Sequence, residues 1–222
     1  RLTAAQIVAG CYYSDSFASE PLCRQFSRDA TTGSVDNIYN SYINIAQQEN
    51  RGWDFSMRYR TEVPWGELML DTQHTFQIGD SYRLYTDSEE ISTNGEMGEP
   101  KWTGRLSASL YSGDWGYFWN VNFIGDASNY AGYGGDTASY RGETVNVRLG
   151  ADTIVYHSLS ASYNFQDQEA TLRIGVSNAT DKNPPRLSTL NLGQVQTQGN
   201  SAFYSQYNAF GRTVFMNFSK AF

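Results

Sequence analysis

The chain has 222 residues, enough for one large β domain or two small ones, and its formal net charge is −7. No run of Lys or Arg supplies the clustered cations that neutralise phosphates, so the sequence excludes nucleic acid as a partner. No stretch approaches the roughly 18 apolar residues of a transmembrane helix, and no signal-peptide pattern is present. Aromatic residues make up 15% of the chain and charged residues 18%, a balance typical of strands between lipid and water. A soluble, Tyr-rich β-sandwich would have a similar composition.

Residues 1–50 contain no segment that reads as a good strand. The stretch 3–10 predicts a short helix, and a turn-rich segment with two cysteines follows it. Cys11 and Cys23 are the only cysteines of the chain, and a loop disulfide in an oxidising compartment is favoured over two free thiols. We expect residues 1–50 to form an extracellular loop region that contains this helix and this disulfide.

From residue 51 onward, apolar and polar side chains alternate with the period of two that indicates β-strands. Seven segments show this alternation: 53–63, 66–78, 102–111, 115–123, 155–165, 170–177 and 213–222. In the fourth segment, Trp115, Tyr117, Trp119, Val121 and Phe123 share one face, which predicts contact with lipid and an aromatic girdle. Four arginines lie on polar faces, at positions 58, 60, 105 and 173. They would meet water in a barrel lumen and equally on a soluble sandwich, so that alternative stays open.

The lengths of the connections alternate strictly. Short links lie at 64–65, 112–114 and 166–168, and long polar stretches lie at 79–101, 126–154 and 179–210. Transmembrane barrels have short periplasmic turns and long extracellular loops, so the pattern predicts the strand directions and places Phe222 on the periplasmic side. Seven strands cannot close a single-chain bacterial barrel, which needs an even number of at least eight. We therefore predict an all-β chain that is a fragment of a transmembrane antiparallel barrel.

Several segments resemble one known family in their order and spacing. They are Cys11 to Cys23 followed by Phe26-Ser27-Arg28-Asp29, Asn50-Arg51-Gly52-Trp53-Asp54-Phe55, Asn178-Ala179-Thr180-Asp181-Lys182-Asn183-Pro184-Pro185, and Tyr207-Asn208-Ala209-Phe210-Gly211-Arg212. These segments are similar to the C-terminal barrel of TonB-dependent outer-membrane receptors. The resemblance implies a 22-stranded barrel around a plug, in which residues 51–222 supply strands 16 to 22. The plug domain and the TonB-contacting segment are absent from this sequence.

The resemblance also implies a function: active uptake of a scarce nutrient, an oligosaccharide or a metal chelate such as a siderophore, across the bacterial outer membrane. The implied partners are outer-membrane lipid, the TonB complex through the missing N-terminal part, the nutrient itself, and in some assemblies a surface lipoprotein. Two alternatives from other classes stay open. One is a secreted all-β lectin-like domain, and the other is an outer-membrane hydrolase barrel with its site at the extracellular rim.

No catalytic or metal-binding arrangement is visible in the sequence. A Gly-x-Ser-x-Gly motif is absent, and His74 and His157 are isolated from each other, so we expect neither an enzyme nor a cofactor or metal. Substrate contacts should come from tyrosines in the long loops, which could stack on sugar rings or on the aromatic groups of a chelate. These are Tyr82, Tyr85, Tyr130, Tyr133, Tyr140, Tyr204 and Tyr207. Ordinary loop packing is the competing interpretation for each of them.

Overall fold

The computed structural model describes residues 3–14, 17–39, 47–83, 89–133, 135–191, 194–203 and 205–221. The chain divides into two compact units. The first contains residues Arg1–Glu49 and Asp80–Ser92, and the second contains Asn50–Gly79 and Thr93–Phe222.

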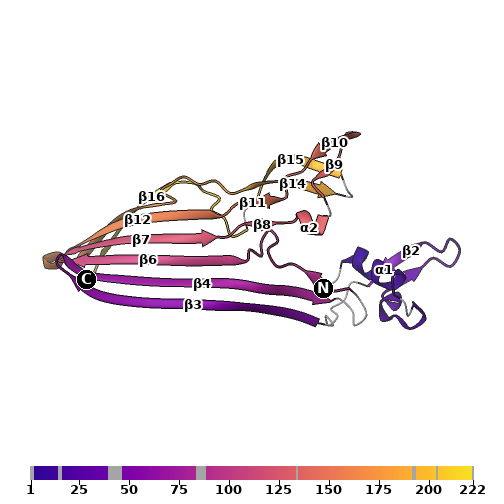
Figure 1. The fold of residues 1–222 in the computed structure, drawn as a ribbon, viewed down its shortest axis with the longest axis horizontal. Coiled ribbons are helices and arrows are strands. Elements are labelled where there is room, and N and C mark those ends of the chain that lie inside the picture. The colour runs from indigo at the N-terminus through magenta and orange to yellow at the C-terminus, as the bar shows by residue number, and fades with distance from the viewer. Residues whose placement is uncertain are drawn as a thin grey trace. The chain divides into compact units, whose positions relative to one another are not determined.

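A wall of long antiparallel strands dominates the second unit (Figure 1). The order across the sheet is β16-β13-β12-β7-β6-β4-β3, so each strand pairs with its neighbour in sequence. The strands are β3 (Gln47–Val63), β4 (Gly66–Arg83), β6 (Trp102–Ser112), β7 (Trp115–Ile124), β12 (Ile154–Phe165), β13 (Ala170–Ser177) and β16 (Thr213–Lys220). All seven predicted strands are present, and the expected all-β wall is confirmed. Strands β3 and β4 are longer than the predicted segments 53–63 and 66–78, in which apolar and polar residues alternate. Backbone pairing does not require apolar side chains, so the strands can extend beyond this alternation.

Short links join β3 to β4, β6 to β7 and β12 to β13. The last of these holds η3 (Gln166–Gln168), whose C-cap Glu169 has a left-handed backbone with φ +47°. The amide of Ala221 donates to the carbonyl of Glu169 at 3.0 Å, so the chain end lies beside this short link (Figure 1). Gly66 has φ +141°, and an added Cβ would overlap the carbonyl oxygen of Tyr111. The turn after β3 therefore requires glycine.

The long loops of the second unit carry secondary structure that the sequence did not indicate. Residues of the loop before β12 form β8 (Ala127–Ser128), α2 (Tyr130–Tyr133), β9 (Thr137–Tyr140), β10 (Glu143–Asn146) and β11 (Gly150–Ala151). The loop before β16 forms β14 (Arg186–Asn191) and β15 (Gln194–Ala202). Both loops join in one small sheet of order β10-β9-β15-β14 (Figure 1). Ala138, Val147 and Leu149 form a buried cluster beneath it.

The first unit is a small lobe held by a covalent link. Its helix α1 (Ala4–Tyr12) begins with a capping box in which Thr3 and Gln6 satisfy each other's backbone amides. Two 3-10 turns follow, η1 (Phe17–Ser19) and η2 (Pro21–Arg24), and then a hairpin of β1 (Phe26–Arg28) and β2 (Val35–Ile38). The predicted helix is present and ends two residues later than expected, whereas the hairpin was not expected. A further short strand, β5 (Ile91–Ser92), pairs with the end of β4.

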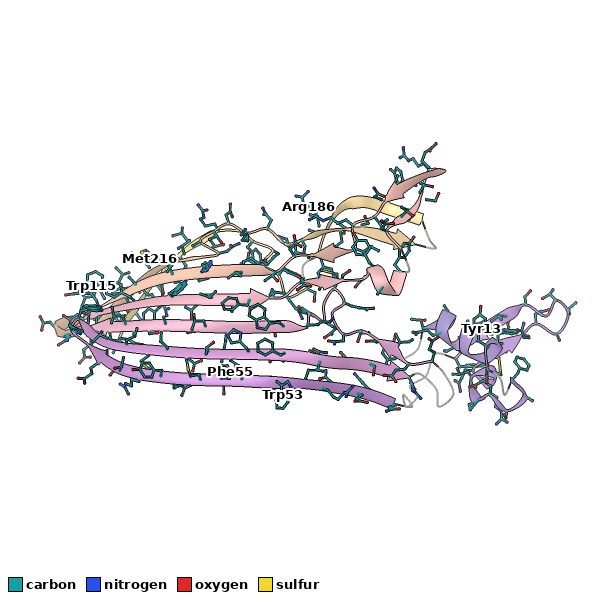
Figure 2. All side chains as sticks on the ribbon, viewed as in Figure 1. Tyr13, Trp53, Phe55, Trp115, Arg186 and Met216 are labelled. Carbon is teal, nitrogen blue, oxygen red and sulfur yellow. A yellow bond between two sulfur atoms is a disulfide. The ribbon has the colours of Figure 1, made fainter. Side chains whose placement is uncertain are left out.

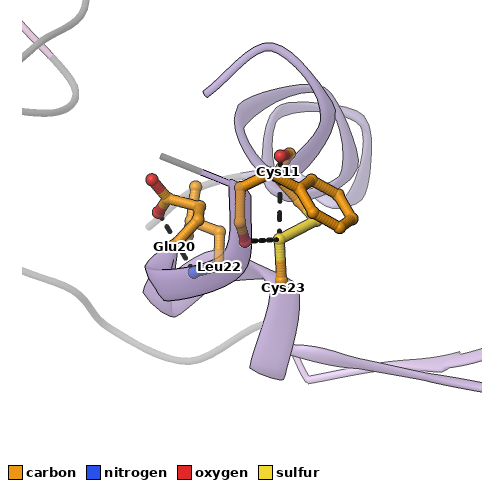
Figure 3. The surroundings of a disulfide bond; sticks show 5 residues. Cys11, Glu20, Leu22 and Cys23 are labelled. Carbon is orange, nitrogen blue, oxygen red and sulfur yellow. Dashed lines mark hydrogen bonds between the residues drawn. A yellow bond between two sulfur atoms is a disulfide. The ribbon is translucent and has the colours of Figure 1, made fainter. Parts of the chain in front are cut away.

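The predicted disulfide joins α1 to η2 in this lobe. Cys11 and Cys23 are bonded, with their Cα atoms 4.8 Å apart (Figure 3). Beside the bond, Glu20 caps η2 by accepting from the amide of Leu22 at 3.2 Å. Among the described residues of the lobe, Ile7, Cys11 and Leu22 form the buried hydrophobic cluster, so the cross-link supplements a small core.

Candidate functional site

One face of the strand wall presents large apolar side chains to its surroundings. Their exposed fractions run from 41% at Trp119 to 73% at Met216. The exposed set includes Trp53, Phe55, Met57, Tyr59, Phe76, Ile78, Trp115, Tyr117, Trp119, Leu159, Ile174, Val214, Met216 and Phe218. Figure 2 shows Trp53 and Phe55 along β3, Met216 on β16, and Trp115 at the short-link end. A soluble sandwich would bury this face, so its surroundings must be apolar.

The length of this apolar face is sufficient to cross a membrane. Trp115 and Phe123 lie on the face at opposite ends of β7, and the segment from one to the other spans about 27 Å along the strand. A transmembrane β-strand that is tilted by about 45° has about 9–11 residues. Val121 lies on the same face but is only 2% exposed, so the expectation that it contacts lipid directly is wrong. Leu106 and His157 pair with Val121 on the two neighbouring strands. The short β-branched side chain of Val121 does not extend as far from the sheet as the larger side chains around it.

Both histidines lie on the apolar face and accept hydrogen bonds from tryptophans. Trp102 Nε1 donates to His74 Nδ1 at 3.1 Å, and Trp119 Nε1 lies 3.3 Å from His157 Nδ1. The other ring nitrogen of His74 lies 2.9 Å from the hydroxyl of Thr72, which donates to the carbonyl of Arg105. The polar atoms of His74 are therefore satisfied within an aromatic cluster, as required of polar groups in an apolar medium.

The opposite face of the wall is polar and carries ion pairs. Arg58 Nε contacts Asp71 at 3.0 Å, and Arg60 contacts Glu67 at 2.6 Å, both between β3 and β4. Thr75 donates to Asp54 at 2.6 Å on the same pair of strands. A face of this kind suits water or a polar partner.

A cavity of about 580 Å³ opens on this polar face at the long-loop end of the strands. Its floor comes from β4, β6, β7 and β12, and residues of the segment before β16 cover one side. Its lining residues are Gln73, Thr75, Thr103, Gly104, Arg105, Asn122, Phe123, Ile124, Tyr156, Ser158, Asn178, Gln206, Tyr207 and Asn208. Amides, hydroxyls, one guanidinium and aromatic rings can together bind a polar ligand that has both hydroxyl groups and flat faces.

The segment 205–212, here called the closing segment, is fixed to the cavity by hydrogen bonds at several points. Gln206 Nε2 donates to the carbonyl of Gly98 at 2.7 Å, and the amide of Asn208 donates to the hydroxyl of Tyr156 at 3.2 Å. Gln206 has a positive φ of +68°, which is uncommon outside glycine. At the far end, the amide of Arg212 donates to Asp181 at 2.8 Å.

Tyr207 is the tyrosine of the closing segment that packs against the strand wall. It is 6% exposed and forms a buried cluster with Ile124 and Tyr156. Burial raises the pKa of the Tyr207 phenol above its usual value, and the neighbouring Tyr156 raises it further. The phenol stays protonated at neutral pH, as an ordinary tyrosine does, and the residue lines the cavity.

The other predicted tyrosines that the structure describes do not line this cavity. Tyr130, Tyr133 and Tyr140 pack against the buried cluster under the loop sheet, and the Tyr130 hydroxyl donates to the carbonyl of Val147 at 2.9 Å. Tyr82 lies in β4 within the first unit and is half-buried. Tyr85 and Tyr204 lie outside the described residues.

Several lining residues of the cavity were not anticipated as site residues. Gln73, Arg105, Asn122 and Tyr156 form one row across four strands, because the register pairs 73 with 105, 105 with 122 and 122 with 156. Each lies at an ordinary polar position of its own strand, so only the register brings them together. A sequence signal was available for Asn178, because this polar residue begins the segment from Asn178 to Pro185 that resembles the family. It is 1% exposed and bonds both backbone groups of Lys182.

Within the described residues, no group of three or more His, Cys, Asp or Glu side chains is arranged to hold a metal ion. Among those residues there is also no helix with the length and apolarity needed to span a membrane.

An apolar face long enough to cross a membrane, a polar face with a cavity, and alternating short and long links define a wall of a transmembrane β-barrel. Residues 23–179, more than two thirds of the chain, match the family described as TonB dependent receptor-like, beta-barrel. The chain belongs to this family of TonB-dependent receptors. The family consists of outer-membrane transporters rather than enzymes, which confirms the expected location and class.

A solved structure supports the same fold. The chain is similar to a mutant of the ferric enterobactin receptor PfeA from Pseudomonas aeruginosa, with a TM-score of 0.51 and 15% sequence identity. The similarity covers 81% of this chain and 23% of that receptor, so the chain spans about a quarter of the receptor's length. A search of curated proteins finds no match.

Proposed function

We propose that this chain forms part of a TonB-dependent transporter that takes up a scarce nutrient, an oligosaccharide or a metal chelate, across the outer membrane. The observation that carries the proposal is the opposed chemistry of the two wall faces, with an apolar band on one and a lined cavity on the other. The chain shares its fold with a ferric enterobactin receptor, and at 15% identity this similarity bears on the fold and not on the choice between the two nutrient classes. The TonB complex would couple through a plug and N-terminal segment outside this sequence.

In this proposal the long loops face the cell exterior and the short links face the periplasm. Residues 1–50 then form an extracellular loop region, and residues 51–222 are strands 16 to 22 of the barrel. A surface lipoprotein would dock on the long loops. Substrate contacts would come from the cavity and from the loop tyrosines Tyr82, Tyr85, Tyr130, Tyr133, Tyr140, Tyr204 and Tyr207. Among them Tyr207 has the best support, because its side chain lines the cavity.

The two competing functions each conflict with a specific observation. A secreted lectin would have to expose the apolar face of the wall to water. An outer-membrane hydrolase would need a histidine beside an acid at the rim. His74 and His157 instead bond tryptophans on the apolar face.

Growth of a deletion strain tests the proposal. The gene for the full-length protein is deleted, and growth is measured on panels of single oligosaccharides as carbon source and single chelates as iron source. We expect a defect on one nutrient that equals the defect of a strain without TonB. Complementation by the full-length protein should restore growth. The Tyr207→Phe variant, which keeps the ring, should restore more uptake than Tyr207→Ala. Normal growth on every nutrient that requires TonB would contradict the proposal.

A further inference from the structure

Arg105 lies at the centre of the cavity floor. On β6 it pairs with Gln73 of β4 on one side and with Asn122 of β7 on the other, so two neutral amides flank its side chain. All three residues line the cavity, and Arg105 is exposed. The cation therefore faces open space in a row of uncharged hydrogen-bonding groups.

Three other arginines of the polar face, Arg58, Arg60 and Arg173, each have an interaction partner within the protein. Arg58 and Arg60 form ion pairs with carboxylates, and neither lines the cavity. Arg173 donates to the hydroxyl of Ser160 at 2.9 Å and lies over the ring of Phe118, 4.4 Å from its centroid. Among the described residues, by contrast, the Arg105 guanidinium has no hydrogen bond, ion pair or ring contact. Of the arginines described on this wall face, Arg105 alone is left available for a ligand.

Two carboxylates on the polar face of the neighbouring β3–β4 pair are already engaged. Asp71 lies two residues from Gln73 along β4 and binds Arg58 Nε at 3.0 Å. Asp54 accepts from the hydroxyl of Thr75 at 2.6 Å. Neither lines the cavity, whose polar side chains apart from Arg105 are amides and hydroxyls. An anion in the cavity would meet one cation and several neutral donors.

We infer that Arg105 is the anion-binding residue of this cavity and that the transported ligand carries a carboxylate. A guanidinium can bind a carboxylate through two parallel N–H···O bonds, while Gln73 and Asn122 can donate from either side. The cavity volume of about 580 Å³ suits a ligand of one or two sugar rings or a compact chelate. The inference rests on the proposed function and narrows its substrate class to acidic sugars and carboxylate chelates.

Binding by the purified full-length protein tests the inference without requiring transport. Calorimetry would compare two probe pairs: D-glucuronate with D-glucose, and ferric citrate with the neutral ferric tris(acetohydroxamate). The first pair detects an acidic sugar and the second a carboxylate chelate. We expect one anionic probe to bind more tightly than its neutral partner, with an affinity that falls as salt is raised.

Variants assign this preference to Arg105. In Arg105→Gln, affinity for the preferred anionic probe should fall about 10- to 100-fold, the effect of losing a charge-assisted hydrogen bond, and neutral probes should bind unchanged. Arg105→Lys should recover part of the loss because it keeps the charge. Arg58→Gln is the matched control, since it removes one cation from the same face outside the cavity.

Each other outcome overturns the inference. Equal binding of the charged and neutral member in both pairs would show that the ligand needs no carboxylate. An equal loss in Arg105→Gln and Arg58→Gln would assign the preference to the general charge of the wall. Unchanged binding in Arg105→Gln, together with a lower melting temperature, would indicate that Arg105 pairs with another part of the protein. In each of these cases a nutrient-specific growth defect would still support the proposed transport function.

Discussion

The disulfide lobe of the first unit and the strand wall of the second are stabilised by different means. In the described part of the lobe the buried hydrophobic cluster consists of Ile7, Cys11 and Leu22, and Cys11–Cys23 joins the helix to the 3-10 turn. The wall exposes many of its large apolar residues and is held by continuous ladders from β3 to β16. Its apolar side chains are therefore stabilised by lipid rather than by a protein core. The difference predicts that each region responds to a perturbation that the other tolerates.

The largest expected effect comes from placing a charge on the lipid face of the wall. Leu159 pairs with Trp119, midway between Trp115 and Phe123, and is 48% exposed on the apolar face, whereas Ser56 of β3 lies on the polar face. Arginine at a lipid-facing position near the membrane midplane costs about 2–4 kcal/mol. Leu159→Arg in the full-length protein should therefore lower the free energy of unfolding and the yield of heat-modifiable barrel. Ser56→Arg should leave both nearly unchanged, and equal effects would contradict the assignment of faces.

Removing the cross-link should affect the lobe and spare the wall. Closing a loop with a sequence separation of 12 stabilises by about 3 kcal/mol on the chain-entropy estimate. In a protein with Cys11→Ser and Cys23→Ser, we expect proteases to cleave within residues 1–49 much faster. Heat modifiability of the barrel should stay as in the wild type. Mass spectrometry of the unreduced, alkylated wild type should find one linked peptide pair. Two alkylated thiols would show that the bond is absent in the protein.

A smaller effect should follow from filling the space beneath His74. An added Cβ at Gly104 would overlap the imidazole ring, so Gly104→Ala should displace His74 and break its bonds to Trp102 and Thr72. Two hydrogen bonds at about 0.5–1.5 kcal/mol each predict a loss of about 1–3 kcal/mol in the wall. The measurement is a double-mutant cycle with His74→Ala, in which Gly104→Ala should cost much less once the ring is gone. Additive costs would show that the ring does not oppose the new methyl group.

The wall could be predicted from sequence because lipid and water impose opposite chemistry on alternate residues. In β7, for example, Trp115, Tyr117 and Trp119 mark one face while Asn120 and Asn122 mark the other. The faces follow from such local patterns, whereas the cavity does not. Gln73, Arg105, Asn122 and Tyr156 become neighbours only through the register of four strands. The loops from β4 to β6 and from β7 to β12 are too long for the sequence to determine that register.

The loop sheet and the lobe hairpin were missed for related reasons. β9 and β15 pair although more than fifty residues separate them, and neither has an apolar alternation. The hairpin of β1 and β2 did carry a local signal, an Asp29 followed by Thr31, Thr32 and Gly33. Asp29 Oδ1 accepts from both threonine amides, at 2.9 Å and 2.7 Å, and Gly33 has φ +72°. Aspartate at the start of a turn and glycine at its left-handed position are the chemistry of such a turn.

The smallest expected effect is a pH dependence of this same turn in the lobe. Hydrogen bonds from the Thr32 amide, the Thr32 hydroxyl and the Thr31 amide hold the pKa of the Asp29 carboxyl below its usual value of 3.8. Because the pKa is lowered in the folded hairpin, the carboxylate stabilises the turn fully above pH 3.8, and this stabilisation is lost as the pH falls through the lower folded value. Hydrogen exchange corrected for intrinsic rates should show less protection of residues 26–38 at acidic pH than at pH about 6. Asp29→Asn keeps an acceptor oxygen but cannot titrate, so its protection should be the same at both pH values. The strands of the wall serve as the internal reference, and a loss of protection that is as large in Asp29→Asn as in the wild type would assign the pH dependence to other groups.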